Sequence, residues 1–171
     1  MIDNLPSNSS EKNQILLSEE QYHRITQELE LLRNKIKSQL VLFGDLNGQL
    51  ISQKGELLGV DMSILTALIS SDFSATSEIA KILSKDNRFT LHFHEGSKRN
   101  LYISGVGTQF FLAVIFDTTV TLGMVRIFTQ KTIEKIGHII ETSFDEVNRL
   151  NTIIDSEFKS FVVEGLDKIL E

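Results

Sequence analysis

The sequence contains no cysteine, which excludes disulfide bonds and metal sites built from thiolates. It has no apolar run near the roughly 20 residues that a membrane-spanning helix needs. Residues 1–12 are polar and lack the basic start and apolar stretch of a secretory signal. The net charge of -6 argues against a surface that binds nucleic-acid phosphates. We expect a globular cytoplasmic protein of one domain with extensions, since the chain has 171 residues and is 41% hydrophobic.

A helix start is the first strong local signal, and it follows a leader of residues 1–17 that we expect to be disordered. Ser18-Glu19-Glu20-Gln21 has the form of a capping box, with a hydroxyl at the cap, a glutamine three residues later and acids in the first turn. Apolar side chains then recur at spacings of three and four and share one helical face: Tyr22, Ile25, Leu29, Leu32 and Ile36. The pattern predicts a helix from about Glu19 to Lys37.

The next segment predicts a β-hairpin. Leu40-Val41-Leu42-Phe43 is a short β-rich run, and residues 49–54 alternate weakly between apolar and polar side chains. Asn47-Gly48 lies between the two runs, and this pair suits the positive φ angles of a tight turn. We therefore assign Asn47 and Gly48 a structural role in the turn.

A long helix is predicted from Asp61, a good N-cap residue, to Leu83, because this stretch contains neither proline nor glycine. One face is apolar and consists of Ile64, Leu65, Leu68, Ala75, Ile79, Ile82 and Leu83. A second face carries small side chains: Ala67, Ser70, Ser71, Ser74 and Ser77. This second face is either a solvated surface that is rich in serine or a seam at which two helices meet in a dimer.

Three strands are predicted next, joined by turns short enough for antiparallel neighbours. The run from Phe89 to Phe93 alternates, with Phe89, Leu91 and Phe93 on one side. Leu101–Ser104 is the second strand. Gly105-Val106-Gly107 then turns the chain; it resembles a fragment of a phosphate loop, but strands flank it on both sides. The third strand, Phe110–Phe116, is apolar without a break, which indicates a central strand covered on both faces.

The C-terminal part of the chain is predicted to be helical. From Thr121 onward the apolar residues keep a helical period: Leu122, Val125, Phe128, Ile133, Ile136 and Ile140. A further apolar stripe follows Ser143, and residues 145–171 carry seven acids and three bases. We therefore predict a domain of residues 18–142 and a C-terminal helical extension of residues 143–171.

Helices segregated onto the faces of an antiparallel sheet make the predicted class α+β. With this order of elements, the sequence resembles the roadblock family, named after the dynein light chain roadblock, over residues 19–140. The hairpin at residues 40–51 resembles the family's first strand pair, and the helix Asp61–Leu83 resembles its long second helix. Leu122-Gly123-Met124-Val125-Arg126 resembles the Leu-Gly-x-x-Arg opening of its last helix. The acidic stretch after Ser143 departs from the family pattern.

The resemblance implies a fold, an oligomeric state and a class of binding partner. It implies a five-stranded antiparallel sheet between helices, an α-β-α sandwich close to the longin fold, here with an extra C-terminal helix. It implies homodimers in which the second helices lie side by side and the third strands join into one sheet. It also implies binding to Ras-like GTPases, dynein intermediate chain or other scaffolds. Some bacterial members activate GTPases by remodelling the active site of the GTPase and not by inserting a catalytic residue.

The leading hypothesis is a homodimeric adaptor that binds a small Ras-like GTPase, either as an activator without an arginine finger or as a scaffold. We expect no cofactor, no metal, no catalytic activity of its own and no nucleic-acid partner. The alternative is a scaffold subunit that docks on a larger assembly through its C-terminal helix. The predicted dimer or partner interface consists of Ala67, Ser70, Ser71, Ser74, Ser77, Glu78, Lys81, Phe89 and Leu91.

Two histidines raise an enzyme alternative, a metal-dependent hydrolase. His92 and His94 lie two apart on one strand, so that both rings point to the same side. A catalytic zinc needs a third protein ligand. Glu95 points to the other face, whereas His23 and His138 belong to distant helices. We therefore expect two solvated histidines and no metal site.

Two residues at the start of the last helix receive structural roles. Gly123 is expected to allow close packing against the sheet, since glycine in a helix otherwise costs stability relative to alanine. Arg126 is expected to pair with sheet carbonyls or with an acid such as Asp117, and not to serve as an arginine finger. Arg126→Ala is therefore expected to lower stability and to leave stimulated GTP hydrolysis mostly intact.

Overall fold

The computed structural model describes residues 17–85 and 89–141. The elements follow in the order α1 (Glu19–Ile36), β1 (Leu40–Asp45), β2 (Leu50–Gly55), α2 (Met62–Leu83), β3 (Leu91–His94), β4 (Arg99–Val106) and β5 (Phe110–Asp117). A further helix begins at Leu122 and is described as far as residue 141; we call it the last helix. In the described part of the chain, no helix combines the length and the apolar character that a membrane span requires. The predicted extension of residues 143–171 lies outside the described residues, as does the predicted leader up to residue 16.

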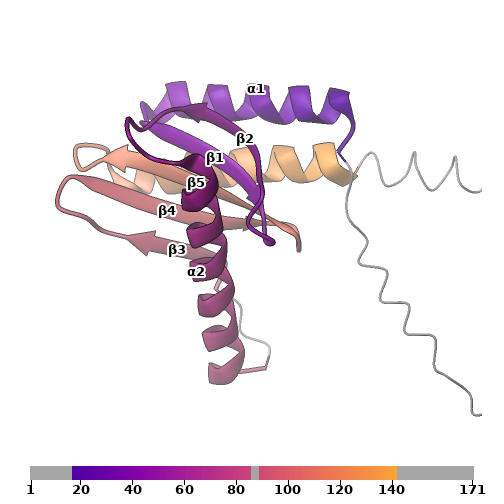
Figure 1. The fold of residues 1–171 in the computed structure, drawn as a ribbon, viewed down its shortest axis with the longest axis vertical. Helices are drawn as coiled ribbons and strands as arrows, with labels where there is room; N and C mark the ends of the chain where they lie inside the picture. Colours follow the sequence, from indigo (N-terminus) through magenta and orange to yellow (C-terminus); the bar gives the residue numbers. More distant parts are fainter. Residues whose placement is uncertain (1–16, 86–88, 142–171) are drawn as a thin grey trace, which may run out of the picture.

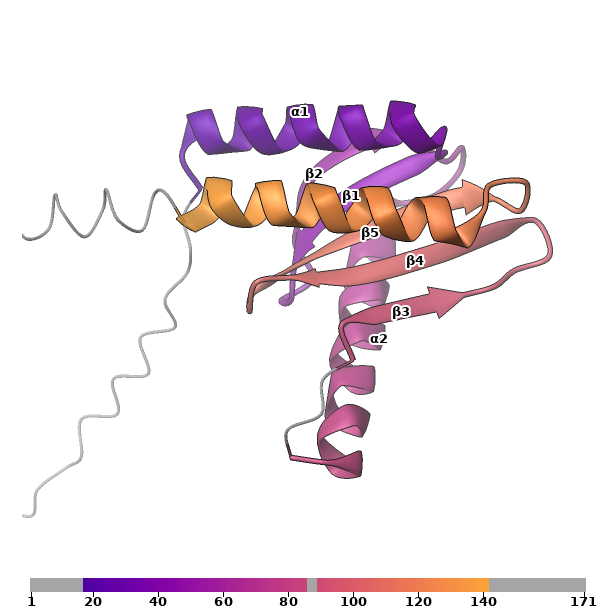
Figure 2. The same cartoon turned by 180° about the vertical axis from the view of Figure 1, so that it is seen from behind.

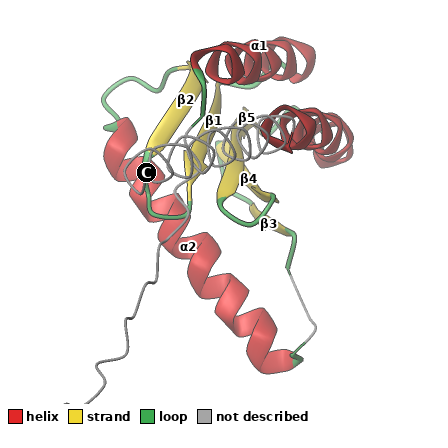
Figure 3. Cartoon of the chain, turned by 90° about the vertical axis from the view of Figure 1, so that its right-hand side faces the viewer, coloured by secondary structure: helices red, strands yellow, loops and turns green. Residues whose placement is uncertain are grey.

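The strands form one antiparallel sheet in the order β2-β1-β5-β4-β3. α1 and the last helix lie side by side on one face of the sheet, and α2 crosses the other face (Figures 1 and 2). Seen from the side, the sheet separates the two helical layers (Figure 3). This arrangement confirms the predicted α+β class and the five-stranded sheet between helices. It also confirms that β5 is central, because β5 pairs with β1 on one side and with β4 on the other.

Each face of the sheet has its own hydrophobic core. Residues of β1 alternate between them: Val41 and Phe43 belong to the core under α1, and Leu40 and Leu42 to the core under α2. β1 is therefore buried on both faces, like β5. The helices add apolar side chains to these cores: Ile25, Leu29, Leu32 and Ile36 from α1, Val125, Ile136, Ile139 and Ile140 from the last helix, and Ile69 and Phe73 from α2.

α1 begins as the sequence predicts. The backbone N–H of Gln21 donates to Ser18 Oγ at 3.2 Å, and that of Ser18 donates to Gln21 Oε1 at 2.8 Å, which completes the capping box. The side chain of Gln21 also donates to the carbonyl of Ile139 in the last helix, at 2.8 Å. Further along, Lys135 Nζ lies 2.9 Å from a carboxylate oxygen of Glu28. These two contacts show that α1 and the last helix run antiparallel.

The predicted hairpin between β1 and β2 is confirmed, but its turn differs from the expected one. Gly48 has a φ of 90°, whereas Asn47 has a negative φ. The backbone N–H of Gly48 donates to the carbonyl of Asp45 at 3.1 Å, and that of Asp45 donates to the carbonyl of Gln49 at 3.0 Å. The loop therefore has three residues. The carboxylate of Asp45 stabilises it by accepting from the backbone N–H groups of Asn47 and Gln49, at 3.0 and 2.8 Å.

Two strand boundaries correct the predictions. β3 begins at Leu91, so Phe89 precedes the strand. β4 continues to Val106, and Gly105 pairs with Phe111 within the sheet. The turn therefore falls at Gly107, where φ is 59°. Gly105 lies inside the strand and allows a close approach of α2, because a Cβ there would lie 3.1 Å from the ring of Phe73.

Candidate protein-interaction site

α2 is apolar on the face that it turns away from the sheet. The side chains that it buries are Thr66, Ile69, Ser70, Phe73 and Ala80. Five large apolar side chains of α2 remain exposed; one is Leu83 at its end, and we call the other four the α2 stripe: Ile64 (61% exposed), Leu68 (63%), Ile79 (52%) and Ile82 (84%). At 3.6 residues per turn they fall within an arc of about 60°. They therefore form one apolar strip along the helix, which nothing in the described chain covers.

The position of α2 increases the exposure of this strip. In Figures 1 and 2, the C-terminal half of α2 continues past β3 and stands clear of the sheet. This half carries Ile79 and Ile82, and Leu83 at its end is also exposed. Large exposed apolar surfaces on a soluble protein usually mark a site of protein interaction. The geometry of α2 therefore identifies its outer face as a candidate interaction surface.

The predicted small-residue face divides between the core and the surface. Ser70 is buried, and its hydroxyl donates to the carbonyl of Leu46 at 2.7 Å. Its assignment to an interface is therefore wrong, because a side chain with this partner lies between α2 and the sheet. Ser77 is half-buried, and its hydroxyl donates back to the carbonyl of Phe73 at 2.8 Å.

The other small residues of α2 lie on the exposed side. Ala67, Ser71 and Ser74 are exposed beside the α2 stripe, and the hydroxyl of Ser71 donates to the carbonyl of Ala67 within the helix at 2.8 Å. Glu78 and Lys81 are exposed as well and form an ion pair with each other. For these five residues the interface assignment stays a prediction. The structure extends the surface by placing the large apolar residues next to them.

β3 is an edge strand of the described sheet, since it pairs there with β4 alone. Its side chains alternate as predicted: Leu91 and Phe93 pack against the core under α1, and His92 faces α2. Phe89 is half-buried just before the strand. Because Leu91 already contacts its own core, β3 offers a partner mainly the free backbone groups of its outer edge. The interface assignment of Phe89 and Leu91 stays a prediction.

The two histidines of β3 have different environments, contrary to the expectation that both are solvated. His92 is buried and stacks on Phe73, and neither ring nitrogen has a hydrogen-bond partner among the described residues. Its Nδ1 lies 3.8 Å from Asp72 Oδ2, and His94 Nε2 lies 2.9 Å from the same oxygen. Burial lowers the pKa of His92 from its ordinary range, against the opposing attraction of Asp72. Within residues 17–85 and 89–141, no group of three or more metal-ligating side chains is placed to hold a metal ion.

The residues at the start of the last helix do not have the expected contacts. A Cβ built on Gly123 would meet no described atom within 4 Å, so this glycine does not serve close packing against the sheet. Arg126 is exposed and forms no ion pair or hydrogen bond with any described residue. Asp117, its expected partner, accepts instead from the backbone N–H of Thr119 at 2.9 Å. Both structural assignments are therefore corrected.

Comparison with known proteins agrees with this fold. The family model of the Roadblock/LC7 domain matches residues 27–116, which is more than half of the chain. The chain belongs to the Roadblock/LC7 family. The predicted resemblance to the roadblock family is thereby confirmed, with residues 27–116 of the predicted range 19–140 matched by the family model.

Solved structures of proteins called MglB resemble this Roadblock/LC7 chain over most of their length. MglB of Myxococcus xanthus is 33% identical, with 74% of this chain and 95% of that chain covered and a TM-score of 0.70. The gliding protein MglB of Thermus thermophilus is 26% identical, with 75% and 96% covered and a TM-score of 0.67. A further MglB, described as having a tetrameric arrangement, is 27% identical with the same coverage and TM-score.

Sequence reasoning grouped the side chains of the α2 stripe into one apolar face, but it did not predict that this face of the Roadblock/LC7 chain is exposed and that α2 packs on the sheet through another face. A signal for this exposure was present, because α2 carries more apolar residues than one sheet face can cover. Apolar side chains occupy two opposite faces of the helix. One face carries Ile64, Leu68 and Ile79, and the other carries Ile69 and Phe73. A helix with this pattern needs a cover on both sides.

Proposed function

We propose that this Roadblock/LC7 protein is a homodimeric regulator of a small Ras-like GTPase, and that two copies pair through the outer face of α2. The observation that carries the proposal is the α2 stripe, a row of large apolar side chains on an element that already packs against its own sheet. Covering such a row removes apolar surface from water, which stabilises the contact by about 25 cal/mol of free energy per Å² buried. We propose that this protein is cytoplasmic and that it acts on a GTPase in the same compartment.

The spacing of the α2 stripe supports pairing with a second copy in particular. In a two-fold symmetric contact, if one residue of the first copy contacts a second residue of the other copy, the reverse contact also forms. If two α2 helices cross antiparallel near Ser74, Leu68 of each copy meets Ile79 of the other, and Ile64 meets Ile82. Ala75 and Ser71 lie between these pairs, and their small side chains allow the backbones to approach at the crossing. The row is therefore self-complementary.

The edge position of β3 supports the same arrangement. β3 has unpaired backbone groups along one side, because its only neighbour in the described sheet is β4. α2 passes beyond this edge (Figure 1), so that pairing of α2 helices brings the two β3 edges to the same side of the contact. Hydrogen bonding between the two β3 strands then extends the sheet across the dimer. This is also the arrangement that the resemblance to the roadblock family implies.

The choice of a GTPase as partner comes from the family. The resemblance to the roadblock family implies partners that include Ras-like GTPases, and the similarity to the MglB structures of Myxococcus xanthus and Thermus thermophilus supports a bacterial member of the family. The tetrameric arrangement of one MglB supports self-association within this group. The alternative role, a scaffold that docks through residues 143–171, depends on residues outside the described part of the chain.

Single-turnover hydrolysis of GTP tests the proposed role. The full-length protein is mixed with the GTP-loaded Ras-like GTPase of the same organism, and phosphate release is followed. We expect faster hydrolysis or slower nucleotide exchange than for the GTPase alone, and loss of the effect in Leu68→Asp. A GTPase whose hydrolysis and exchange both stay unchanged at saturating protein would contradict the proposed role.

A further inference from the structure

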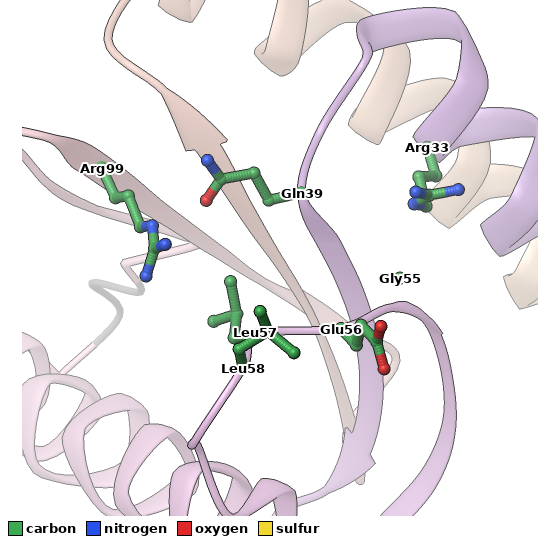
Figure 4. Close-up of a pocket in the computed structure, with 7 residues that line it drawn as sticks. All are labelled: Arg33, Gln39, Gly55, Glu56, Leu57, Leu58 and Arg99. Atoms are coloured by element: carbon green, nitrogen blue, oxygen red, sulfur yellow. The ribbon is translucent and has the colours of Figure 1, made fainter.

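A hollow of about 620 Å³ lies at one end of the sheet, away from the α2 stripe. It forms where β1 begins, β2 ends and β4 begins, next to the loop that leads into α2 (Figure 4). Its lining consists of Arg33, Gln39, Gly55, Glu56, Leu57, Leu58 and Arg99. None of these residues belongs to the surface proposed for dimer formation, so the hollow needs an explanation of its own.

The hollow contains an arginine without a partner. Arg99 is exposed, and its guanidinium forms no ion pair or hydrogen bond with any residue that the structure describes. In Figure 4 its side chain extends into the hollow toward Leu57 and Leu58. Arg33, at the other end, pairs with Glu30 at 3.5 Å through Nη1, and its Nε is buried without a partner among the described residues. Glu56 is the only acidic residue of the described lining. Arg99 is thus the one charged side chain of the described lining that both extends into the hollow and is basic without a partner, and an unpaired guanidinium favours an anionic group on a ligand.

The hollow also contains an unused hydrogen-bond acceptor. Gln39 Oε1 is buried and has no hydrogen-bond partner in the described chain. The backbone of Gln39 is held in place, because its N–H donates to the carbonyl of Ile115 at 2.9 Å. Figure 4 places its amide group between Arg99 and Leu57. A buried acceptor without a donor costs free energy, which a ligand with an N–H group would recover.

The third feature of the hollow is aliphatic. Leu57 and Leu58 form one wall, and Leu58 is 92% exposed. No aromatic side chain of the described residues lines the hollow, so a nucleobase would find no ring on which to stack. A ligand that satisfies all three features carries a carboxylate for Arg99, an N–H group for Gln39 and an apolar group for Leu57 and Leu58. A peptide in which an acidic residue stands next to aliphatic residues has this chemistry.

We propose that this hollow is a second binding site, which takes an acidic peptide segment of a partner protein. Arg99 binds the acidic side chain, Gln39 accepts from the peptide backbone, and the wall of Leu57 and Leu58 covers a neighbouring aliphatic side chain. The site is separate from the α2 stripe, and the proposal does not depend on the role in GTPase regulation.

Fluorescence anisotropy with the full-length protein tests the site. The probe is a fluorescein-labelled decapeptide of alternating leucine and glutamate, and the control peptide has lysine in place of glutamate. We expect binding of the glutamate peptide only. Arg99→Gln is expected to weaken binding about tenfold or more, because a charged hydrogen-bonding partner is lost. Arg99→Lys is expected to retain part of the affinity. Lys98→Gln is the matched control, since Lys98 is exposed next to Arg99 but does not line the hollow.

In the anisotropy experiment, three results would overturn the proposal: no binding of the glutamate peptide, unchanged affinity of Arg99→Gln, or equal weakening by Lys98→Gln. A photoreactive residue at position 58 of the purified protein distinguishes the occupants. Crosslinks to the added peptide support the site, and crosslinks to residues 142–171 of the same chain would contradict a separate partner. Light scattering on Arg99→Gln separates this site from the proposed pairing, because the dimer mass should not change.

Discussion

The ring of His92 on β3 stacks on the ring of Phe73 on α2, with ring centroids 4.7 Å apart and ring planes 23° apart. This contact connects the edge strand to the helix, the two elements that we propose to form the dimer interface. Neither nitrogen of His92 has a hydrogen-bond partner in the described chain, although Nδ1 lies 3.8 Å from Asp72 Oδ2. Burial disfavours a positive charge on this ring, whereas Asp72 favours it. The junction of β3 and α2 is therefore sensitive to the protonation of one side chain.

We predict that the free energy of unfolding decreases as the pH falls below about 6.5, and that His92 contributes to the decrease. Burial lowers the pKa of His92 in the folded state from the ordinary value of 6.5, while Asp72 opposes the shift. Below pH 6.5 the unfolded chain thus binds more protons at this site than the folded chain does, and protonation favours unfolding. The decrease ends once the pH passes the lowered pKa of the folded state.

Urea unfolding at pH 7 and pH 5 measures this effect. His92→Gln should reduce the difference in unfolding free energy between the two pH values. His23→Gln is the control, because His23 is exposed on α1 and should leave the difference as in the wild type. Equal pH dependence in the wild type and His92→Gln would show that His92 is not the group responsible.

The two classes of serine on α2 give a second prediction. Ser70→Ala should lower the free energy of unfolding by about 1 kcal/mol, because the carbonyl of Leu46 loses its buried donor, and should leave the dimer mass unchanged. Ser74→Arg should have the opposite profile, with stability near that of the wild type and impaired pairing, because Ser74 is exposed where we propose that the helices cross. Thermal unfolding and light scattering on both variants test this; identical behaviour of the two would argue against the assigned faces.

Gly55 gives a third prediction. Its φ is 87°, and a Cβ there would lie 2.1 Å from the carbonyl oxygen of Gln39. Gly55→Ala should therefore lower the free energy of unfolding by about 2–4 kcal/mol. Gly59→Ala is the matched control, because Gly59 also has a positive φ, of 75°, but no described atom lies within 4 Å of its added Cβ. We expect this control to lose only about 1 kcal/mol, the cost of the backbone conformation alone. Similar losses in both variants would mean that the close approach of Gln39 does not matter.

A fourth prediction concerns Arg126, for which the structure replaces the original expectation. Arg126 is exposed and has no hydrogen bond or ion pair within the described chain, so Arg126→Ala should change the free energy of unfolding by less than about 0.5 kcal/mol. Its one resolved electrostatic effect is on Tyr102, where it opposes the rise in pKa that burial causes. Stimulated GTP hydrolysis should persist in this variant, and its loss at normal stability would indicate that Arg126 acts directly on the GTPase.

Local signals predicted most of the fold. The capping box at Ser18 set the start of α1, and the unbroken apolar run from Phe110 identified the central strand, because both depend on residues close in sequence. The hairpin was predicted for the same reason. The position of its turn and the positive φ of Gly48 were predicted as well, but the three-residue form of the loop was not, since it depends on the backbone N–H groups that the carboxylate of Asp45 binds.

The candidate site was less accessible to sequence reasoning, because it depends on which face of α2 the sheet covers. Ile64 and Ile69 are equally apolar, yet one is exposed and the other is buried. The burial of His92 depends on Phe73, which lies nineteen positions earlier on another element. The contacts predicted for Gly123 and Arg126 were wrong for the same reason. Each required a contact between the last helix and the sheet, and no local sequence pattern specifies such a contact.

Light scattering on the purified full-length protein at micromolar concentration tests most directly whether the α2 stripe pairs two copies. We predict a mass of twice the 19.3 kDa of one chain for the wild type. Leu68→Asp should give the mass of one chain, because it places a charge within the apolar stripe, opposite Ile79 of the second copy. Leu31→Asp should behave as the wild type, since Leu31 is similarly exposed, at 58%, but lies on α1. A monomeric wild type, or a Leu68→Asp variant that remains dimeric, would contradict pairing through α2.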